Sequence, residues 1–157
     1  MQRNILLSQR LREVFLSGDW IANTNWKTLI ENTTWQQANQ KIGDHNSIAA
    51  LTYHLNYYLA GLLHAYATGN LEIKDKYSFD MPPIHSEEEW LDLVQIFVTN
   101  AESFADLVAN MEESYLDQAF INEKYGTNLR NIEGMIEHAY YHMGQVSLLK
   151  KLLSHAL

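Results

Sequence analysis

The sequence NIEGMIEHAYYHMGQVSLLKKLL, residues 131–153, decides the fold because its apolar residues recur at helical spacing over about six turns. A step of four residues turns a helix by about 400°, so His138 and His142 lie about 40° apart on one side. Val146 shares that side, whereas Glu137 lies on the other face. We therefore expect a long amphipathic helix with both histidines facing the core.

Two other segments have the same periodicity and clear end signals. The segment DHNSIAALTYHLNYYLAGLLHAYATGN, residues 44–70, has an N-cap candidate in Asn46 or Ser47 and ends at Gly69. The segment SEEEWLDLVQIFVTNAESFADLVANM, residues 86–111, opens with a serine and a glutamate at capping-box spacing. Each segment predicts one long helix.

The rest of the chain supplies a first helix and the connections. Four apolar residues predict this helix before Gly18, which we expect to end it in the left-handed conformation: Leu7, Leu11, Val14 and Phe15. Residues 20–43 predict short helices and turns, Pro82 and Pro83 mark a loop, and residues 115–126 alternate weakly enough to suggest a short hairpin arm. Four long helices joined by loops predict a single all-α domain over residues 1–157, folded as a four-helix bundle.

Composition excludes several classes of function. The chain has 11 Lys plus Arg against 19 Asp plus Glu, and the resulting net charge of −8 disfavours nucleic acid as a partner. No cysteine is present, which excludes a thiolate nucleophile and fits a reducing cytoplasmic location. No segment resembles a signal peptide or a membrane span, so we expect no membrane partner. The partner expected from the core-facing histidines is a small-molecule substrate.

The two inward histidines need polar partners, and a metal ion would satisfy both rings at once. His54 lies at the edge of the apolar stripe of residues 44–70, so it can project between helices and act as a third ligand beside His138 and His142. The remaining histidines fall in loops, on a polar face or at the C-terminus, and we expect them to be solvated: His45, His64, His85 and His155. A core histidine bonded to backbone or water is the alternative interpretation for each inward ring.

Two familiar metal chemistries do not match these residues. A ferritin-like di-iron site needs a glutamate three residues before each helical histidine, but Met135 and Ala139 occupy those positions. A zinc protease needs a glutamate next to the first histidine of the pair, where Ala139 stands. A mononuclear three-histidine site remains, with open positions for water or substrate and no carboxylate on the helical faces of its ligands.

The stretches SIAALTYHLNYYLAG, with His54, and NIEGMIEHAYYHMGQVSLLKKLL, with His138 and His142, resemble the DinB-like (YfiT-like) superfamily of four-helix-bundle metalloenzymes. The resemblance covers nearly the whole chain. It implies a divalent metal, nickel, zinc, iron or manganese, held by these three histidines. Some members are transferases or isomerases that use a low-molecular-weight thiol such as bacillithiol or mycothiol, so the resemblance also implies a thiol as cosubstrate.

Because the chain lacks its own nucleophile, we predict a metal-dependent, thiol-using S-transferase that acts on a small electrophile. Hydrolysis is less well supported, because no carboxylate base is evident beside the histidines. Tyr57 or Tyr58, Tyr141 and Gln145 are the inward polar residues expected to line the substrate pocket, the alternative being core aromatics whose hydroxyls reach solvent. Two other functions compete: a noncatalytic, stress-associated protein that binds a metal or small ligand, and a purely structural bundle with separated histidines.

The last helix also carries a second apolar stripe, formed by Ile132, Ile136, Ala139 and Met143. It lies about 100° to 160° from His138, so the apolar surface is wider than one core contact needs. Either a homodimer covers this stripe, or the first helix and the connection after it do.

Overall fold

Helices form the architecture of the computed structural model, which describes residues 2–155. The long helices are α1 (Arg3–Arg12), α4 (Ile48–Thr68), α5 (Glu87–Ala109) and α6 (Asn128–His155), and the short helices are α2 (Trp26–Glu31) and α3 (Trp35–Asn39). A π-helical turn, Glu13–Ser17, extends α1, and 3₁₀ turns occupy Asp75–Tyr77, Glu113–Asp117 and Glu123–Tyr125. The all-α prediction is confirmed. Where a hairpin arm was expected, the described chain forms only the isolated bridge between Ala119 and Thr127.

Most helix ends lie where the capping residues in the sequence predicted them. Ser47, one of the two N-cap candidates, accepts a hydrogen bond from the backbone N–H of Ala50, and Gly69 ends α4 with a φ of 74°. Thr34 forms a complete capping box at the start of α3, and the side chain of Ser86 caps α5. The expected short helices between residues 20 and 43 are α2 and α3.

Gly18 ends the first helical segment for a different reason from the one predicted. Its φ of −86° and ψ of 154° are extended rather than left-handed. A Cβ atom at this position would lie 2.5 Å from the Cα of Glu13, closer than real Cβ contacts allow. The absent side chain therefore permits close backbone approach at the end of the π-helical turn.

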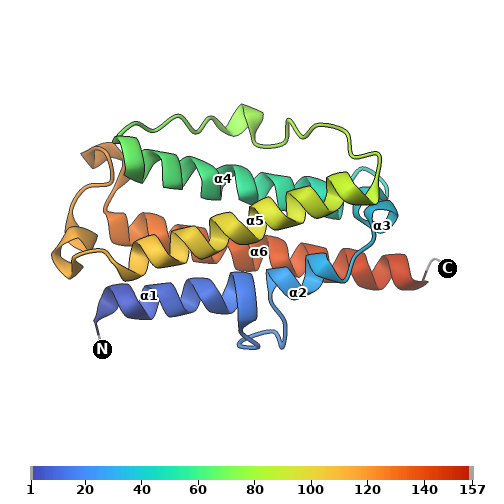
Figure 1. Ribbon diagram of the computed structural model, residues 1–157, viewed down its shortest axis with the longest axis horizontal. Coiled ribbons are helices and arrows are strands. Elements are labelled where there is room, and N and C mark those ends of the chain that lie inside the picture. Colours follow the sequence, from blue (N-terminus) through green and yellow to red (C-terminus); the bar gives the residue numbers. More distant parts are fainter. Residues whose placement is uncertain (1, 156–157) are drawn as a thin grey trace.

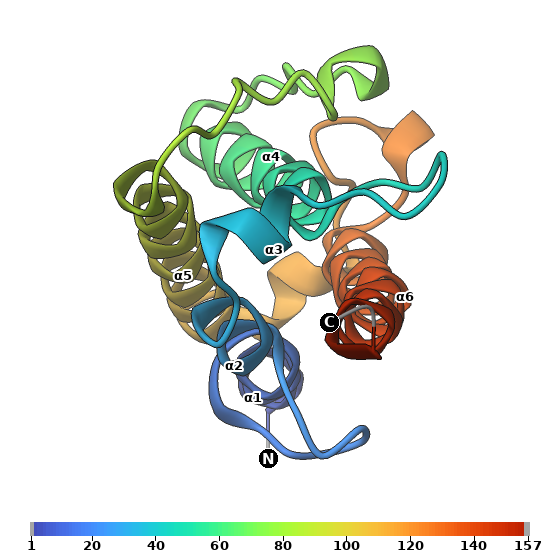
Figure 2. The same cartoon turned by 90° about the vertical axis from the view of Figure 1, so that its right-hand side faces the viewer.

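The four long helices lie side by side, and their directions determine which connections are long. Viewed end-on, α5 lies between α1 and α4, while α6 closes the arrangement against α4 and α1 (Figure 2). Helices α4 and α5 run in the same direction, so residues 70–86 return along the length of α4 before α5 begins (Figure 1). We call residues 70–86 the return segment.

The second apolar stripe of α6 is covered within the chain. Ile132, Ile136 and Ala139 have no exposed surface, and Met143 is 2% exposed. Trp26 of α2 is fully buried and its indole N–H donates to the carbonyl oxygen of Ala139 at 2.9 Å. The N-terminal region therefore covers this stripe, as one of the two alternatives predicted. The stripe no longer gives a reason to expect a homodimer.

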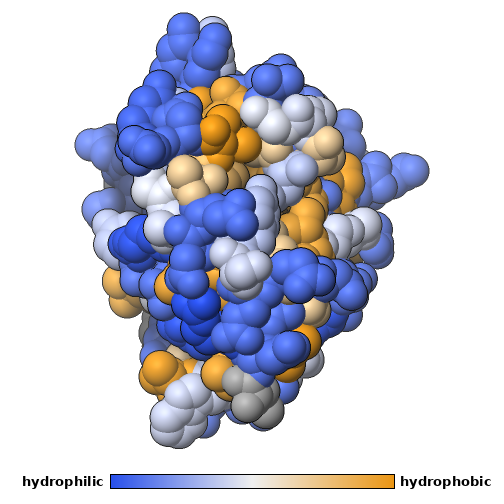
Figure 3. All heavy atoms as spheres, turned by 90° about the vertical axis from the view of Figure 1, so that its left-hand side faces the viewer, coloured by the Kyte–Doolittle hydropathy of each residue, from blue (hydrophilic) through white to orange (hydrophobic). Residues whose placement is uncertain are grey.

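The face of the molecule that lies at the left of Figure 1 is mostly hydrophilic (Figure 3). At the end that carries residues 110–127, hydrophilic residues surround separate apolar patches (Figure 3). Within residues 2–155, no helix combines the length and the apolar character that crossing a membrane requires.

Lys150 fastens the end of α2 to α6 by three hydrogen bonds. Its ammonium group donates to the carbonyl oxygens of Leu29 at 2.6 Å and Asn32 at 2.8 Å, and to the hydroxyl of Thr33 at 2.9 Å. Carbonyls at the end of a helix lack intrahelical partners, so this ammonium acts as their cap. Burial lowers the pKa of Lys150, because removing the ammonium group from water disfavours its charged form.

We expect the Lys150→Met substitution to lower the free energy of unfolding by about 1–3 kcal/mol, because it leaves these acceptors without their charged donor. Urea denaturation monitored by circular dichroism measures this difference. Lys151→Met is the matched control, since Lys151 is exposed on the same helix and should change stability by less than about 0.5 kcal/mol. Equal effects of the two substitutions would contradict the capping role.

Candidate metal centre

The three histidines singled out from the sequence meet between α4 and α6. The Nε2 atom of His138 lies 3.0 Å from Nε2 of His54 and 2.8 Å from Nε2 of His142. One ligand atom from each ring falls within 4.8 Å of the other two, so the group can hold a metal ion. His54 and His142 are buried, each with 7% of its surface exposed, and His138 is half-buried.

Protons alone do not satisfy this cluster. A ring nitrogen carries either one proton or one in-plane lone pair, but Nε2 of His138 faces two other ring nitrogens at once. An ion about 2.0 to 2.2 Å from each nitrogen, in tetrahedral or octahedral geometry, separates the nitrogens by about 2.8 to 3.6 Å. The two separations at His138 fall within that interval and the ligand atoms of His54 and His142 lie within 4.8 Å of each other, so the three residues could hold a divalent metal.

Neighbouring groups orient the rings. Nδ1 of His142 lies 2.5 Å from Oε1 of Gln145, an acceptor that places the proton on Nδ1 and leaves the Nε2 lone pair facing the other rings. The ring of Phe79 stacks on His54 with centroids 4.1 Å apart and planes 12° from parallel. Nδ1 of His54 is buried without a well-aligned partner, although the nearby Ser78 backbone favours the protonated ring.

Burial keeps the rings neutral. It lowers the pKa of His54 and of His138 to about 4, and the neighbouring His142 contributes to both shifts. The pKa of His142 is also lowered by burial, against the hydrogen bond with Gln145. At pH 7 all three rings are therefore neutral, which is the protonation state a metal ligand needs.

A carboxylate joins the centre from the return segment. Asp75 favours the protonated form of both His54 and His138, and its Oδ1 accepts a hydrogen bond of 2.8 Å from the hydroxyl of Tyr58. No sequence signal identified Asp75, because it stands in an irregular stretch beside other charged residues, LEIKDKYSFD. Phe79 was missed for the same reason.

Two contacts fix the return segment on α4. The hydroxyl of Tyr57 accepts from the backbone N–H of Lys74 at 2.9 Å and donates to its carbonyl at 3.1 Å. A Cβ at Gly61 would lie 2.4 Å from Cγ1 of Ile73, so this glycine admits the segment against the helix. The segment that carries Asp75 is thereby held beside the histidines.

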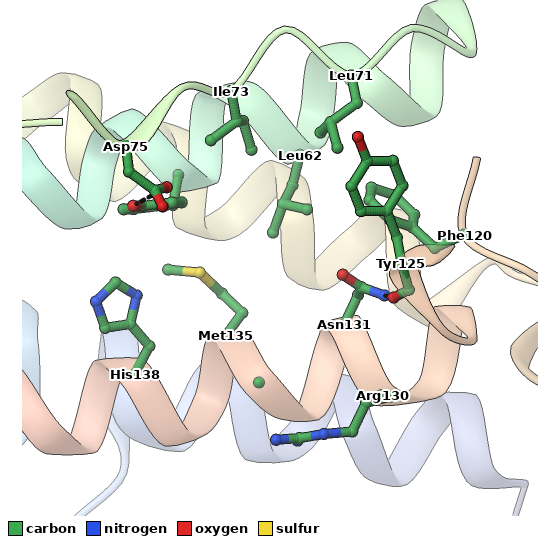
Figure 4. Close-up of a pocket in the computed structure, with 12 residues that line it drawn as sticks. Leu62, Leu71, Ile73, Asp75, Phe120, Tyr125, Arg130, Asn131, Met135 and His138 are labelled. Atoms are coloured by element: carbon green, nitrogen blue, oxygen red, sulfur yellow. Dashed lines mark hydrogen bonds between the residues drawn. The ribbon is translucent and has the colours of Figure 1, made fainter. Parts of the chain in front are cut away.

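A pocket of about 570 Å³ opens beside His138. Tyr58 and Asp75 line it near the histidine, and it continues along α6 toward Asn131. Met135 and Asn131 project from α6 into the space below the return segment (Figure 4). The histidine cluster thus borders a cavity large enough for a small organic molecule.

Only some of the residues expected to line a substrate pocket lie at the pocket beside His138. Tyr58 lines the pocket, and its ring packs edge-on against His54 and His138. Tyr57 holds the return segment instead, and Gln145 orients a histidine. The expectation that Tyr141 is an inward residue is wrong, because it is 66% exposed, with its ring edge-on to His142 at 4.9 Å between centroids.

The remaining histidines lie apart from the cluster. His45, His64 and His85 are exposed, as predicted. The side chain of His155, also expected to be solvated, lies outside the described residues.

Comparisons with known proteins add no relative to this picture. Neither protein-family models, nor curated proteins, nor solved structures gave a match to the chain. The resemblance to the DinB-like superfamily therefore stays a prediction from the residues of the sequence.

We expect a divalent metal in solution to stabilise the protein through the three histidines. At a free metal concentration of about 100 times the dissociation constant, the gain is about 2.7 kcal/mol. Thermal melting of metal-stripped protein, with and without added nickel or zinc, measures it. The His138→Gln variant should lose the gain, whereas His85→Gln, which alters an exposed histidine, should retain it. A gain of the same size in His138→Gln would place the metal elsewhere.

The pKa shifts predict how metal-free protein responds to acid. The unfolded chain binds a proton on each histidine near pH 6.5, whereas folded His54 and His138 do so only near pH 4. Unfolding therefore takes up protons between these values, and the free energy of unfolding falls as pH falls from about 6.5 to about 4. Urea titrations at successive pH values test this, and His54→Gln should make the slope shallower by up to about 1.4 kcal/mol per pH unit. An unchanged slope would contradict the assignment.

Proposed function

We propose that the protein is a metal-dependent enzyme with a mononuclear three-histidine centre, built on a DinB-like four-helix bundle. The observation that carries the proposal is the convergence of His54, His138 and His142 beside an open pocket. The placement of α1, α4, α5 and α6 around one core supports the bundle. The identity of the metal, among nickel, zinc, iron and manganese, belongs to the same proposal.

The reaction we infer is transfer of a small thiol to a small electrophile. The chain has no cysteine, so the thiol must be a separate molecule. A divalent metal held by the three histidines would supply Lewis acidity that lowers the pKa of a thiol at its open position. In the transfer, the sulfur bonds to the electrophilic carbon, the leaving group departs with its bonding electrons, and the thiol proton passes to solvent.

Residues of the chain would prepare this reaction. Gln145 holds the tautomer in which Nε2 of His142 presents its lone pair. Burial raises the pKa of Tyr58, and so does its hydrogen bond to Asp75, so the hydroxyl stays protonated and its proton is held by the Asp75 carboxylate. Phe79 and Tyr58 cover two sides of the His54 ring, which limits the access of water to the centre.

The alternative function is a noncatalytic, stress-associated protein that binds a metal or small ligand. A closed site would favour that function. The pocket beside His138 favours the enzyme, because it leaves room for a molecule next to the ligand nitrogens. Cytoplasmic location fits either function and is proposed on the absence of cysteine.

We expect metal-loaded protein to accelerate the reaction of a low-molecular-weight thiol with 1-chloro-2,4-dinitrobenzene, measured by absorbance across a panel of thiols. His142→Ala should lose the acceleration because it removes a ligand. Gln145→Ala should weaken metal affinity by roughly 10- to 100-fold, so it should need more metal for the same rate. His85→Gln is the control. Equal rates for His142→Ala and the parent protein, with each metal, would favour the binding role.

A further inference from the structure

The pocket beside His138 is larger than a metal and a small head group require. It extends along α6 from His138 to Asn131, seven residues earlier, a length of about 10 Å. Its volume of about 570 Å³ lies in the ordinary range for sites that enclose an organic ligand. The pocket therefore has a second region, beyond the histidines, with its own chemistry.

This second region is mainly apolar. Its walls come from α4, the return segment, the connection before α6, and α6 itself: Leu62, Leu71, Ile73, Phe120 and Met135. At the far end, both amide N–H groups of Asn131 are already used, because they donate to the carbonyl oxygens of Tyr125 and Thr127. Tyr125 and Arg130 complete the lining at that end, and the guanidinium of Arg130 donates to Glu137 at 3.0 Å. The apolar walls between this end and His138 favour a hydrocarbon chain over a polar one.

Gly134 keeps the two regions continuous. It lies one helical turn before His138 on the same side of α6, and it lines the pocket. A Cβ built at Gly134 would meet only Nη1 of Arg130, at 3.9 Å, which is ordinary contact with the end of a flexible side chain. An added Cβ therefore fits at this position without moving the backbone, and because Gly134 lines the pocket, a longer side chain would take up pocket space.

We infer that the pocket takes an elongated small molecule, with a polar head at His138 and an apolar tail about 10 Å long that passes Gly134. The inference rests on the proposed function for the head group, since the metal centre holds that end. It adds the class of substrate: an electrophile or ligand with a linear or weakly branched hydrocarbon tail. Gly134 is then a specificity-determining residue, because its missing side chain admits the tail.

A series of linear alkyl hydroxamic acids, from acetyl to decanoyl, tests this arrangement, because the hydroxamate chelates metal and only the tail varies. Isothermal titration calorimetry with zinc-loaded protein measures each dissociation constant. Affinity should rise about fourfold per added methylene while the tail lies within the pocket. The rise should stop once the tail exceeds about 10 Å.

Variants of two glycines on α6 locate the tail. Gly134→Leu should weaken octanoyl hydroxamate at least tenfold and leave acetohydroxamate unchanged, because only the long tail reaches the new side chain. Gly144→Leu is the matched control: this exposed glycine lies outside the pocket lining, and a Cβ there has no neighbour within 4 Å. Both variants replace a helical glycine with a better helix former, so they should fold.

The outcomes separate the tail pocket from the metal chemistry. Affinity independent of chain length in the parent protein would overturn the inference, and so would equal weakening of octanoyl hydroxamate by the two glycine variants. If acetohydroxamate still needs metal in either case, the proposed function stands. If chain length matters and Gly134→Leu abolishes the dependence, but affinity is the same in metal-stripped protein, the tail pocket is supported and the proposed function fails.

Discussion

Three imidazole rings meet between α4 and α6, with Nε2 of His138 within 3.0 Å of a nitrogen on each of the other two, a contact that would be repulsive if all three rings were charged. Burial keeps the rings neutral, and the surrounding elements supply the burial. Helix α4 brings one ring and α6 brings two, so the centre exists only where these helices pack together. The return segment then covers His54 with Phe79 and places Asp75 beside the pocket. The site therefore also depends on the position of the return segment over α4.

The sequence was sufficient for features that depend on local periodicity. Helix ends at Ser47 and Gly69 follow from capping preferences that act within a few residues. The histidine pair follows from the rotation of one helix, and His54 from its place at the edge of a stripe. Asp75 could not be found this way, because its position depends on how an irregular segment packs against α4. Its neighbours in the chain carry no period from which a direction could be calculated.

The second apolar stripe of α6 shows that periodicity predicts the burial of a helix face but not the segment that buries it. An apolar face requires burial, but its residues are the same whether another chain or a distant part of the same chain covers it. Here the N-terminal region covers it: α1, the π-helical turn and α2 contact α6, and the indole N–H of Trp26 donates to the carbonyl of Ala139. The role of Gly18 likewise depends on contacts that the sequence pattern does not reveal. A glycine after a helix suggests a left-handed end, yet here the reason for glycine is the proximity of the Glu13 backbone.

Helix α6 carries two of the histidines on one rigid rod, whereas the third belongs to α4. The spacing within the pair is therefore built into a single helix, and only the His54 contact depends on how far one helix has slid along the other. A displacement by the rise of one residue, about 1.5 Å, is large compared with the tolerance of a metal–nitrogen bond. The three histidines consequently converge only when α4 and α6 are correctly aligned along their lengths. Occupancy by a metal would select one register of the two helices out of those that apolar packing alone permits.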